Sequence, residues 1–411
     1  MKRIGVLAWC LLVAVWAHGQ VEFDTIYKFP DKKGETIKVI RGIVTAESKT
    51  EVKYKIAEGQ EKTIEAELVS KVVYIARGGD AVAKAQEKVA KGLAEFDKGG
   101  FEEATTILGA AIKDAEANPR LPEWIGAYAR FHTGLAFLRL GQEMESKGIA
   151  QVLVKRRYES AVKSFDDFAA KHPTHRLQFD LPVAQATALL KLGAEQYDKA
   201  LALLDGVPSG ARNPYAQLRR FNALKLKGDI LVLKGRNDQA LDAYKELMRA
   251  MPAENPIDEV VGIRQDVGVF IGMVLLKKAE DSSDATSYKD AEEYFGKILA
   301  DVAATGVTVR SLGKVYLSIG ECRRAAKDWE KAMWYYLHGC IAFFDDPEVH
   351  RESLLNVIIC LDELVQKTQD RDKKKQLMDS LAEYYRQLKL GYGATPAAMK
   401  GGTIYKKYFP N

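Results

Sequence analysis

The chain has 411 residues, of which 47% are hydrophobic and 28% are charged, so it is long enough to bury a sizeable core. Its formal net charge of +5 is small for this length and does not indicate nucleic-acid binding, which usually needs concentrated basic patches. Basic clusters at residues 155–157 and 372–375 stand among acidic residues, which is typical of solvated helix faces.

Residues 1–19 have the pattern of an export signal. Lys2 and Arg3 precede an apolar run over residues 4–16, and residues 17–19 offer a small-x-small cleavage pattern. The run is short for a bilayer span, so an uncleaved anchor is the weaker alternative. We therefore expect a periplasmic or secreted protein that has no transmembrane segment after signal cleavage.

Residues 20–78 predict a small antiparallel β module. Val52, Tyr54 and Ile56 alternate with lysines, as in a half-buried strand, and Gly42 suits a strand that bends to close a sheet. Turn signals separate the predicted strands at residues 31–34, 47–50 and 58–60. The pattern resembles Sm-like or SH3-like barrels. We favour a structural or docking role over RNA binding, because an exported chain meets little RNA.

From about residue 81 the hydrophobic period changes to 3.6, which predicts helices. In residues 223–252, Gly228 and Ala240 are expected where two antiparallel helices cross closely. Tyr244 is expected to fill the wedge between neighbouring hairpins, and Pro252 to end the second helix.

The same order of small and aromatic residues recurs along residues 81–345 and resembles tetratricopeptide repeats. The repeat positions are Gly92, Ala104, Gly134, Ala161, Ala200, Gly228, Ala240, Ala291, Gly313 and Ala332. The resemblance implies a mainly α fold, a right-handed α-solenoid of helical hairpins that follows the β module.

The spacing within these units is irregular. The first small residue precedes the key alanine by twelve residues in three units, by nineteen in two, and by twenty-seven between Gly134 and Ala161. Longer helices or an inserted loop would explain the additions, and the composition of residues 280–287 favours a loop there.

The C-terminal part lacks the motif residues. Residues 346–390 predict a capping helical hairpin, because a solenoid must cover its last apolar face. Residues 391–411 are glycine-rich and predict an extended tail. Its aromatic residues either pack back on the solenoid or, as an alternative, dock onto a second copy and make a homo-oligomer. They are Tyr392, Tyr405, Tyr408 and Phe409.

Candidate chemistry is sparse. Cys322, Cys340 and Cys360 lie in apolar helical patterns and are expected to be buried thiols, with one disulfide as the alternative. His172 and His175 have metal-like spacing, but a capping or surface role is favoured because no further ligand lies nearby. We find no catalytic motif, and expect no enzyme activity, no cofactor and no metal.

Stacked hairpins of this family place their first helices along a concave groove that can hold a peptide or a partner's helix. The resemblance implies a non-catalytic scaffold of the cell envelope or periplasm that binds a protein or peptide there. Cell-wall carbohydrate binding and structural self-assembly are the alternatives. The family's groove positions fall on Gln86, Tyr128, Gln185, Asn222, Lys225, Asp229, Arg310 and Lys314.

Overall fold

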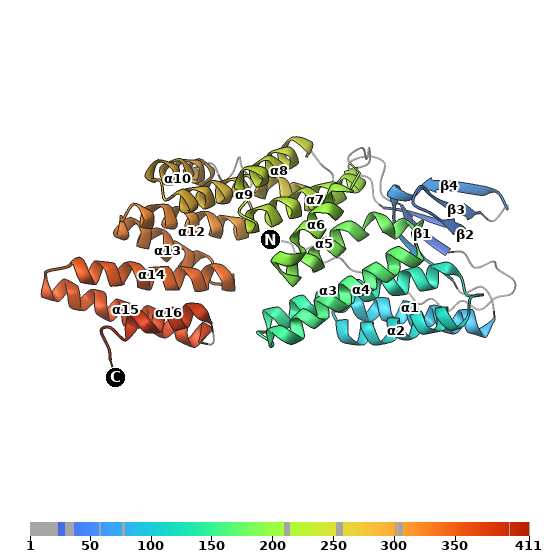
Figure 1. Cartoon of the computed structure of the whole chain (residues 1–411), viewed down its shortest axis with the longest axis horizontal. Helices are drawn as coiled ribbons and strands as arrows, with labels where there is room; N and C mark the ends of the chain where they lie inside the picture. Colours follow the sequence, from blue (N-terminus) through green and yellow to red (C-terminus); the bar gives the residue numbers. More distant parts are fainter. Residues whose placement is uncertain are drawn as a thin grey trace. The chain divides into compact units, whose positions relative to one another are not determined.

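The computed structural model describes residues 24–28, 37–56, 59–75, 79–208, 214–251, 258–300, 302, 307–393 and 395–410 (Figure 1). The predicted export signal and Pro252 lie outside these residues. The described chain is mainly α-helical and begins with an antiparallel sheet, so the predicted fold class is confirmed. None of the described helices is long and apolar enough to cross a membrane.

The chain divides into two compact units. Among the described residues, unit 1 comprises those within 24–136 and 167–178, and unit 2 comprises those within 137–166 and 179–410. The sheet therefore shares a unit with the first helices instead of standing alone.

The sheet in unit 1 has five described strands. They are β1 (Asp24–Lys28), β2 (Lys38–Glu47), β3 (Glu51–Lys55), β4 (Glu61–Glu65) and β5 (Val69–Val73). Their order is β4-β3-β2-β1-β5, with antiparallel neighbours, and a short 3-10 helix, η1 (Ala66–Leu68), precedes β5. The predicted β module is present. The described strands form an open sheet, so the closed barrel expected from the Sm-like resemblance is wrong.

Gly42 allows β3 to pack closely on β2. A Cβ atom at this position would lie 2.6 Å from Tyr54 Cδ2 and 2.9 Å from the Lys55 carbonyl oxygen. The register between β2 and β3 shifts between Val44 and Ala46, next to this contact. The inner face carries Ile26, Val52 and Val69, all fully buried.

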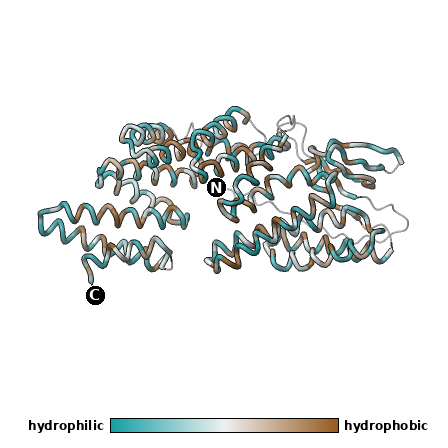
Figure 2. Tube along the Cα trace, in the orientation of Figure 1, coloured by the Kyte–Doolittle hydropathy of each residue, from teal (hydrophilic) through white to brown (hydrophobic). Residues whose placement is uncertain are grey.

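Many helices that follow one another pack against each other as hairpins, and Figure 2 shows hydrophobic and hydrophilic residues alternating along them. The helices are α1 (Asp80–Asp97), α2 (Phe101–Ala117), α3 (Glu123–Ser146), α4 (Gln151–Lys171), α5 (Leu181–Leu192), α6 (Tyr197–Asp205), α7 (Pro214–Leu233), α8 (Asn237–Ala250), α9 (Asp258–Ser282), α10 (Ala285–Ala300), α12 (Val309–Ala325), α13 (Trp329–Ala342), α14 (Pro347–Lys367), α15 (Arg371–Tyr392) and α16 (Pro396–Tyr405). Two short 3-10 helices, η2 (Arg176–Phe179) and η3 (Ala194–Gln196), flank α5.

Glycine lies beneath an aromatic ring where the helices of a hairpin cross. At Gly228 a Cβ atom would lie 2.5 Å from Tyr244 Cε1, so no larger residue fits without movement. Tyr244 thus fills the crossing of its own hairpin, and it also contacts Phe270 of the next hairpin at 5.6 Å between ring centroids. The other glycine–aromatic pairs are Gly141–Tyr158, Gly272–Phe295 and Gly320–Tyr336.

Two predicted repeat positions are shifted by seven residues. Gly141 rather than Gly134 lies under Tyr158, and Gly320 rather than Gly313 lies under Tyr336. Gly313 instead faces Val349 of the next hairpin. The shift equals about two helical turns. Glycines seven residues apart lie on the same helix face, so hydrophobic periodicity does not distinguish between them.

The loop expected within residues 280–287 is wrong. Helix α9 continues to Ser282, and α10 begins at Ala285 after a link of two residues. The Asp284 side chain accepts a hydrogen bond from the Ser287 backbone N–H at 2.8 Å, which caps the new helix. The extra residues of this unit therefore lengthen its helices.

The extended conformation predicted for the tail is also wrong, because residues 396–405 form α16 on α14 and α15. Thr395 caps this helix and Pro396 occupies its first turn. Past its end, the Tyr408 hydroxyl donates to Asp362 Oδ1 at 2.6 Å. Tyr405 stacks on Tyr385, with ring centroids 4.6 Å apart.

The three predicted thiols, Cys322, Cys340 and Cys360, are free and buried in unit 2. Burial raises the pKa of each thiol to about 12. Such thiols act as small core hydrophobes and carry no thiolate near neutral pH.

Candidate functional site

A pocket of about 480 Å³ in unit 2 brings together three of the predicted groove residues. Lys225 and Asp229 come from α7, and Lys314 comes from α12. Phe270 and Met273 of α9 complete the wall between them. The first helices of three successive hairpins therefore contribute to one recess.

Charge and aromatic contacts position the α7 side of this groove pocket. Lys225 Nζ lies 2.8 Å from Asp229 Oδ2 and 4.9 Å from the centroid of the Phe270 ring. Asp229 Oδ1 accepts a hydrogen bond from the Tyr244 hydroxyl at 2.5 Å. Burial, followed by the charge of Asp229, raises the pKa of Tyr244 above its usual value, so this hydroxyl stays a donor.

Apolar side chains at the groove pocket remain open to solvent. Leu233 is 60% exposed and Met273 is 40% exposed, although both lie among buried hydrophobic residues of the hairpins. Exposed apolar groups in a concave, charge-rimmed recess are typical of a binding surface. The groove pocket could therefore bury an apolar side chain and hold a charged group at its rim.

The structure does not bring all eight predicted residues to this recess. Tyr128 and Gln185 are buried by their own chain, so their assignment to a partner-binding surface is wrong. Gln185 donates to Asp166 Oδ1 at 2.5 Å. Gln86 and Asn222 are half-buried and do not line the groove pocket, and the side chain of Arg310 is outside the described part.

The sheet explains why Tyr128 is buried. Tyr74, which follows β5, stacks on Trp124 of α3 with ring centroids 4.1 Å apart. The same tyrosine meets the Tyr128 ring edge-on at 6.0 Å. The face of α3 that the repeat pattern assigns to the groove is thus covered by residues that follow the sheet.

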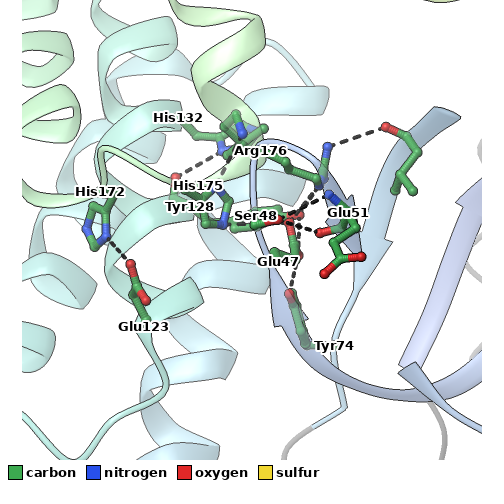
Figure 3. Close-up of polar contacts among 12 residues, drawn as sticks. Glu47, Ser48, Glu51, Tyr74, Glu123, Tyr128, His132, His172, His175 and Arg176 are labelled. Atoms are coloured by element: carbon green, nitrogen blue, oxygen red, sulfur yellow. Dashed lines mark hydrogen bonds and ion pairs between the residues drawn. The ribbon is translucent and has the colours of Figure 1, made fainter. Parts of the chain in front are cut away.

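A buried polar cluster lies at this junction in unit 1 (Figure 3). Glu47, the last residue of β2, accepts a hydrogen bond from Arg176 Nε at 2.6 Å, and both side chains are 3% exposed. Arg176 also donates from Nη2 to the Tyr128 hydroxyl at 2.6 Å. The Tyr74 hydroxyl donates to the same carboxylate of Glu47. Such a cluster holds the sheet and the helices of unit 1 in one register.

Three histidines surround the cluster. His172 and His175 are buried, so of the capping or surface role expected for them the surface part is wrong. The capping part holds for His175, whose Nδ1 accepts the Leu177 backbone N–H at the start of η2. His132 places Nδ1 2.9 Å from the Tyr128 carbonyl oxygen. Burial lowers the pKa of His132 to about 4 and that of His175 to about 3. Both rings are therefore neutral at physiological pH and serve as hydrogen-bonding groups.

These histidines predict that mild acid destabilises unit 1. Their folded-state pKa values lie below the unfolded value of about 6.5, so stability is complete above pH 6.5 and falls as the unfolded chain takes up protons. The loss is on the order of 1.4 kcal/mol per histidine per pH unit until the folded pKa is reached. Thermal unfolding at pH 7 and pH 5 should show a lower midpoint at pH 5, and His175→Gln should reduce the difference. Equal midpoints would contradict the prediction.

Glu47, Tyr74 and Arg176 were not recognised in the sequence. Arg176 directly follows the HPTH segment, so two histidines next to an arginine were the local sequence feature that could have indicated this cluster. Glu47 and Arg176 are separated by 129 positions, and nothing in either local pattern indicates a partner.

Within the described residues, no group of three or more histidine, cysteine or carboxylate side chains could hold a metal ion. No curated protein matches the chain. Residues 151–267 match the family model described as a tetratricopeptide repeat-like domain.

Three solved structures illustrate the similarity. The apo form of RapI has a TM-score of 0.51 and 10% identity, over 79% of this chain and 82% of that chain. The apo form of the quorum sensor NprR from B. thuringiensis has a TM-score of 0.46 and 11% identity, over 81% and 89%. Pseudomonas aeruginosa pilF has a TM-score of 0.35 and 20% identity, over 67% and 98%. The family match and the similarity to RapI show that the chain contains a tetratricopeptide repeat-like domain.

Proposed function

We propose that this chain is a non-catalytic scaffold that binds a peptide segment of a partner protein in the groove pocket of unit 2. The repeat-like fold supports this function, because stacked hairpins present their first helices as one extended surface. The observation that carries the proposal is the recess in which α7, α9 and α12 leave Leu233 and Met273 exposed. Binding of a partner over these exposed apolar side chains is favourable, because it removes apolar surface from water.

The groove pocket favours a segment with an apolar residue next to an acidic one. Its lining includes the cations Lys225, Lys277 and Lys314, against the anions Asp229 and Glu280. Lys225 pairs with Asp229 and Lys277 pairs with Glu280. Lys314 has no ion pair within the described residues, so it is available to a carboxylate of the partner.

Selection of peptides from a random library on the full chain tests this function. The enriched peptides should carry an apolar residue flanked by Asp or Glu. Met273→Asp should weaken the binding of a selected peptide by about tenfold or more, because burial of one apolar side chain is worth about 1.5–3 kcal/mol. Lys314→Glu should weaken binding by a similar factor, because it places a carboxylate opposite the acidic residue of the peptide.

Matched controls lie on α8. Met248 is 37% exposed, close to Met273, but does not line the groove pocket. Lys245 is an exposed lysine of the same helix. Met248→Asp and Lys245→Glu should leave affinity unchanged. Equal losses in the control variants, or no loss in the groove variants, would remove the groove pocket from the function.

The signal-like pattern of residues 1–19 supports a site of action in the periplasm or outside the cell. A mature N-terminus near residue 20, read by N-terminal sequencing, is the expected result. Self-assembly through the tail has less support, because Tyr405 and Tyr408 are engaged by their own chain.

A further inference from the structure

A second pocket, of about 470 Å³, lies within unit 1 and is separate from the groove pocket. Thr45 and Glu47 of β2 form one side, Val82 and Gln86 of α1 form another, and Trp124 lies at the start of α3. We call it the sheet pocket. Its volume falls in the range of small-molecule sites.

His175 supplies a buried donor to the sheet pocket. Its side chain is 3% exposed and belongs to the lining. The Leu177 backbone N–H donates to Nδ1 at 3.2 Å, so in the neutral ring the proton is on Nε2. Glu47 Oε2 lies 3.6 Å from Nε2, which is too long for a hydrogen bond, and no other partner is found among the described residues.

Gln86 supplies an acceptor to the same pocket. Its Nε2 donates to the Tyr74 carbonyl oxygen, which fixes the orientation of the amide. The other amide atom, Oε1, is buried and has no hydrogen-bond partner within the described part of the chain. Burial of a polar atom without a hydrogen-bond partner is unfavourable, so a bound molecule that pairs with these two atoms would be stabilised by them.

The remaining lining restricts the charge of that molecule. Asp24, Glu47 and Glu123 line the sheet pocket, whereas no lysine or arginine among the described residues does. Asp24 accepts the backbone N–H groups of Val44 and Ile75, both at 2.8 Å, so both of its carboxyl oxygens serve as acceptors. An anionic ligand would meet these carboxylates and is disfavoured.

We propose that the sheet pocket binds a neutral polyhydroxylated molecule, a single sugar unit. A hydroxyl group both donates and accepts, so one ligand can accept from His175 Nε2 and donate to Gln86 Oε1. An ammonium ion only donates and would leave His175 unpaired. The apolar C–H face of a sugar ring also suits an aromatic wall such as Trp124, which is only half-buried.

Ligand-observed NMR with the full chain tests the proposal, with D-glucose and N-acetyl-D-glucosamine as probes and choline as the cationic comparison. We expect at least one sugar to bind with a Kd on the order of 1 mM, and choline to show no binding. Gln86→Leu should weaken the binding of the sugar by about tenfold, because one hydrogen bond is lost.

Two further variants separate loss of the site from loss of the fold. Val82→Tyr keeps every polar group of the sheet pocket and fills its volume, so it should abolish sugar binding. If Gln86→Leu fails to fold, Val82→Tyr alone tests whether the sugar binds in the sheet pocket. Gln387→Leu, on α15 in unit 2, is the matched glutamine control and should bind as the unaltered chain does. The proposal is overturned if neither sugar binds at about 20 mM, if choline binds instead, or if the sugar binds unchanged to folded Gln86→Leu and Val82→Tyr.

Discussion

Replacement of Arg176 by leucine should lower the free energy of unfolding of unit 1 by about 3–5 kcal/mol. Arg176 lies against Glu47 with 2.6 Å between Nε and Oε2, and both side chains are almost fully buried. The variant leaves the Glu47 carboxylate buried without its counter-ion, and it also removes the donor to the Tyr128 hydroxyl. Urea unfolding followed by fluorescence of Trp124, in variants that lack the other tryptophans, measures the change.

A partly exposed ion pair provides the control for this prediction. Arg220 and Glu246 lie 2.9 Å apart in unit 2, with the carboxylate about half exposed. Arg220→Leu should cost less than about 1 kcal/mol, because water screens such pairs. Adding Glu47→Gln to Arg176→Leu should recover part of the loss, since it removes the unpaired charge. A loss for Arg176→Leu no larger than that for Arg220→Leu would show that the buried cluster does not hold unit 1 together.

Alanine in place of Gly228 should destabilise unit 2 by about 1–3 kcal/mol. The added Cβ would lie 2.5 Å from Tyr244 Cε1, a ring held between the helices and by its bond to Asp229. The helix preference for alanine over glycine, about 0.5–1 kcal/mol, works in the opposite direction and is outweighed. Urea or thermal unfolding followed by circular dichroism gives the difference.

Gly296 of α10 is the matched control for this steric effect. A Cβ atom there meets nothing within 4 Å, so Gly296→Ala should stabilise the helix by about 0.5–1 kcal/mol. Adding Tyr244→Leu to Gly228→Ala should relieve the overlap, so the double variant should lose less than the sum of the two single changes. If Gly228→Ala behaves like Gly296→Ala, the helices do not cross as closely as the structure has them.

Three residues of the groove pocket could be predicted from the sequence, because they occupy equivalent positions in successive repeats. Lys225, Asp229 and Lys314 occupy equivalent faces of first helices, so one family pattern predicts all three positions. The same pattern failed at Tyr128, where the sheet covers the helix face. It also placed two crossing glycines seven residues early, because a shift of two turns preserves the helical period.

The amino-acid pattern by itself determined the helical class, the preceding β module and the position of Gly228 at a close helix crossing, since each of these depends on residues close in the chain. The structure showed that Tyr244 packs on Gly228 within its own hairpin, whereas the pattern placed this ring between neighbouring hairpins. Only the tertiary structure decided that the sheet is open, that the tail is a helix, and that Glu47 meets Arg176 in the core of unit 1. Pairings between segments more than a hundred residues apart leave no periodic trace, because they depend on where whole elements pack and not on local hydrophobic spacing.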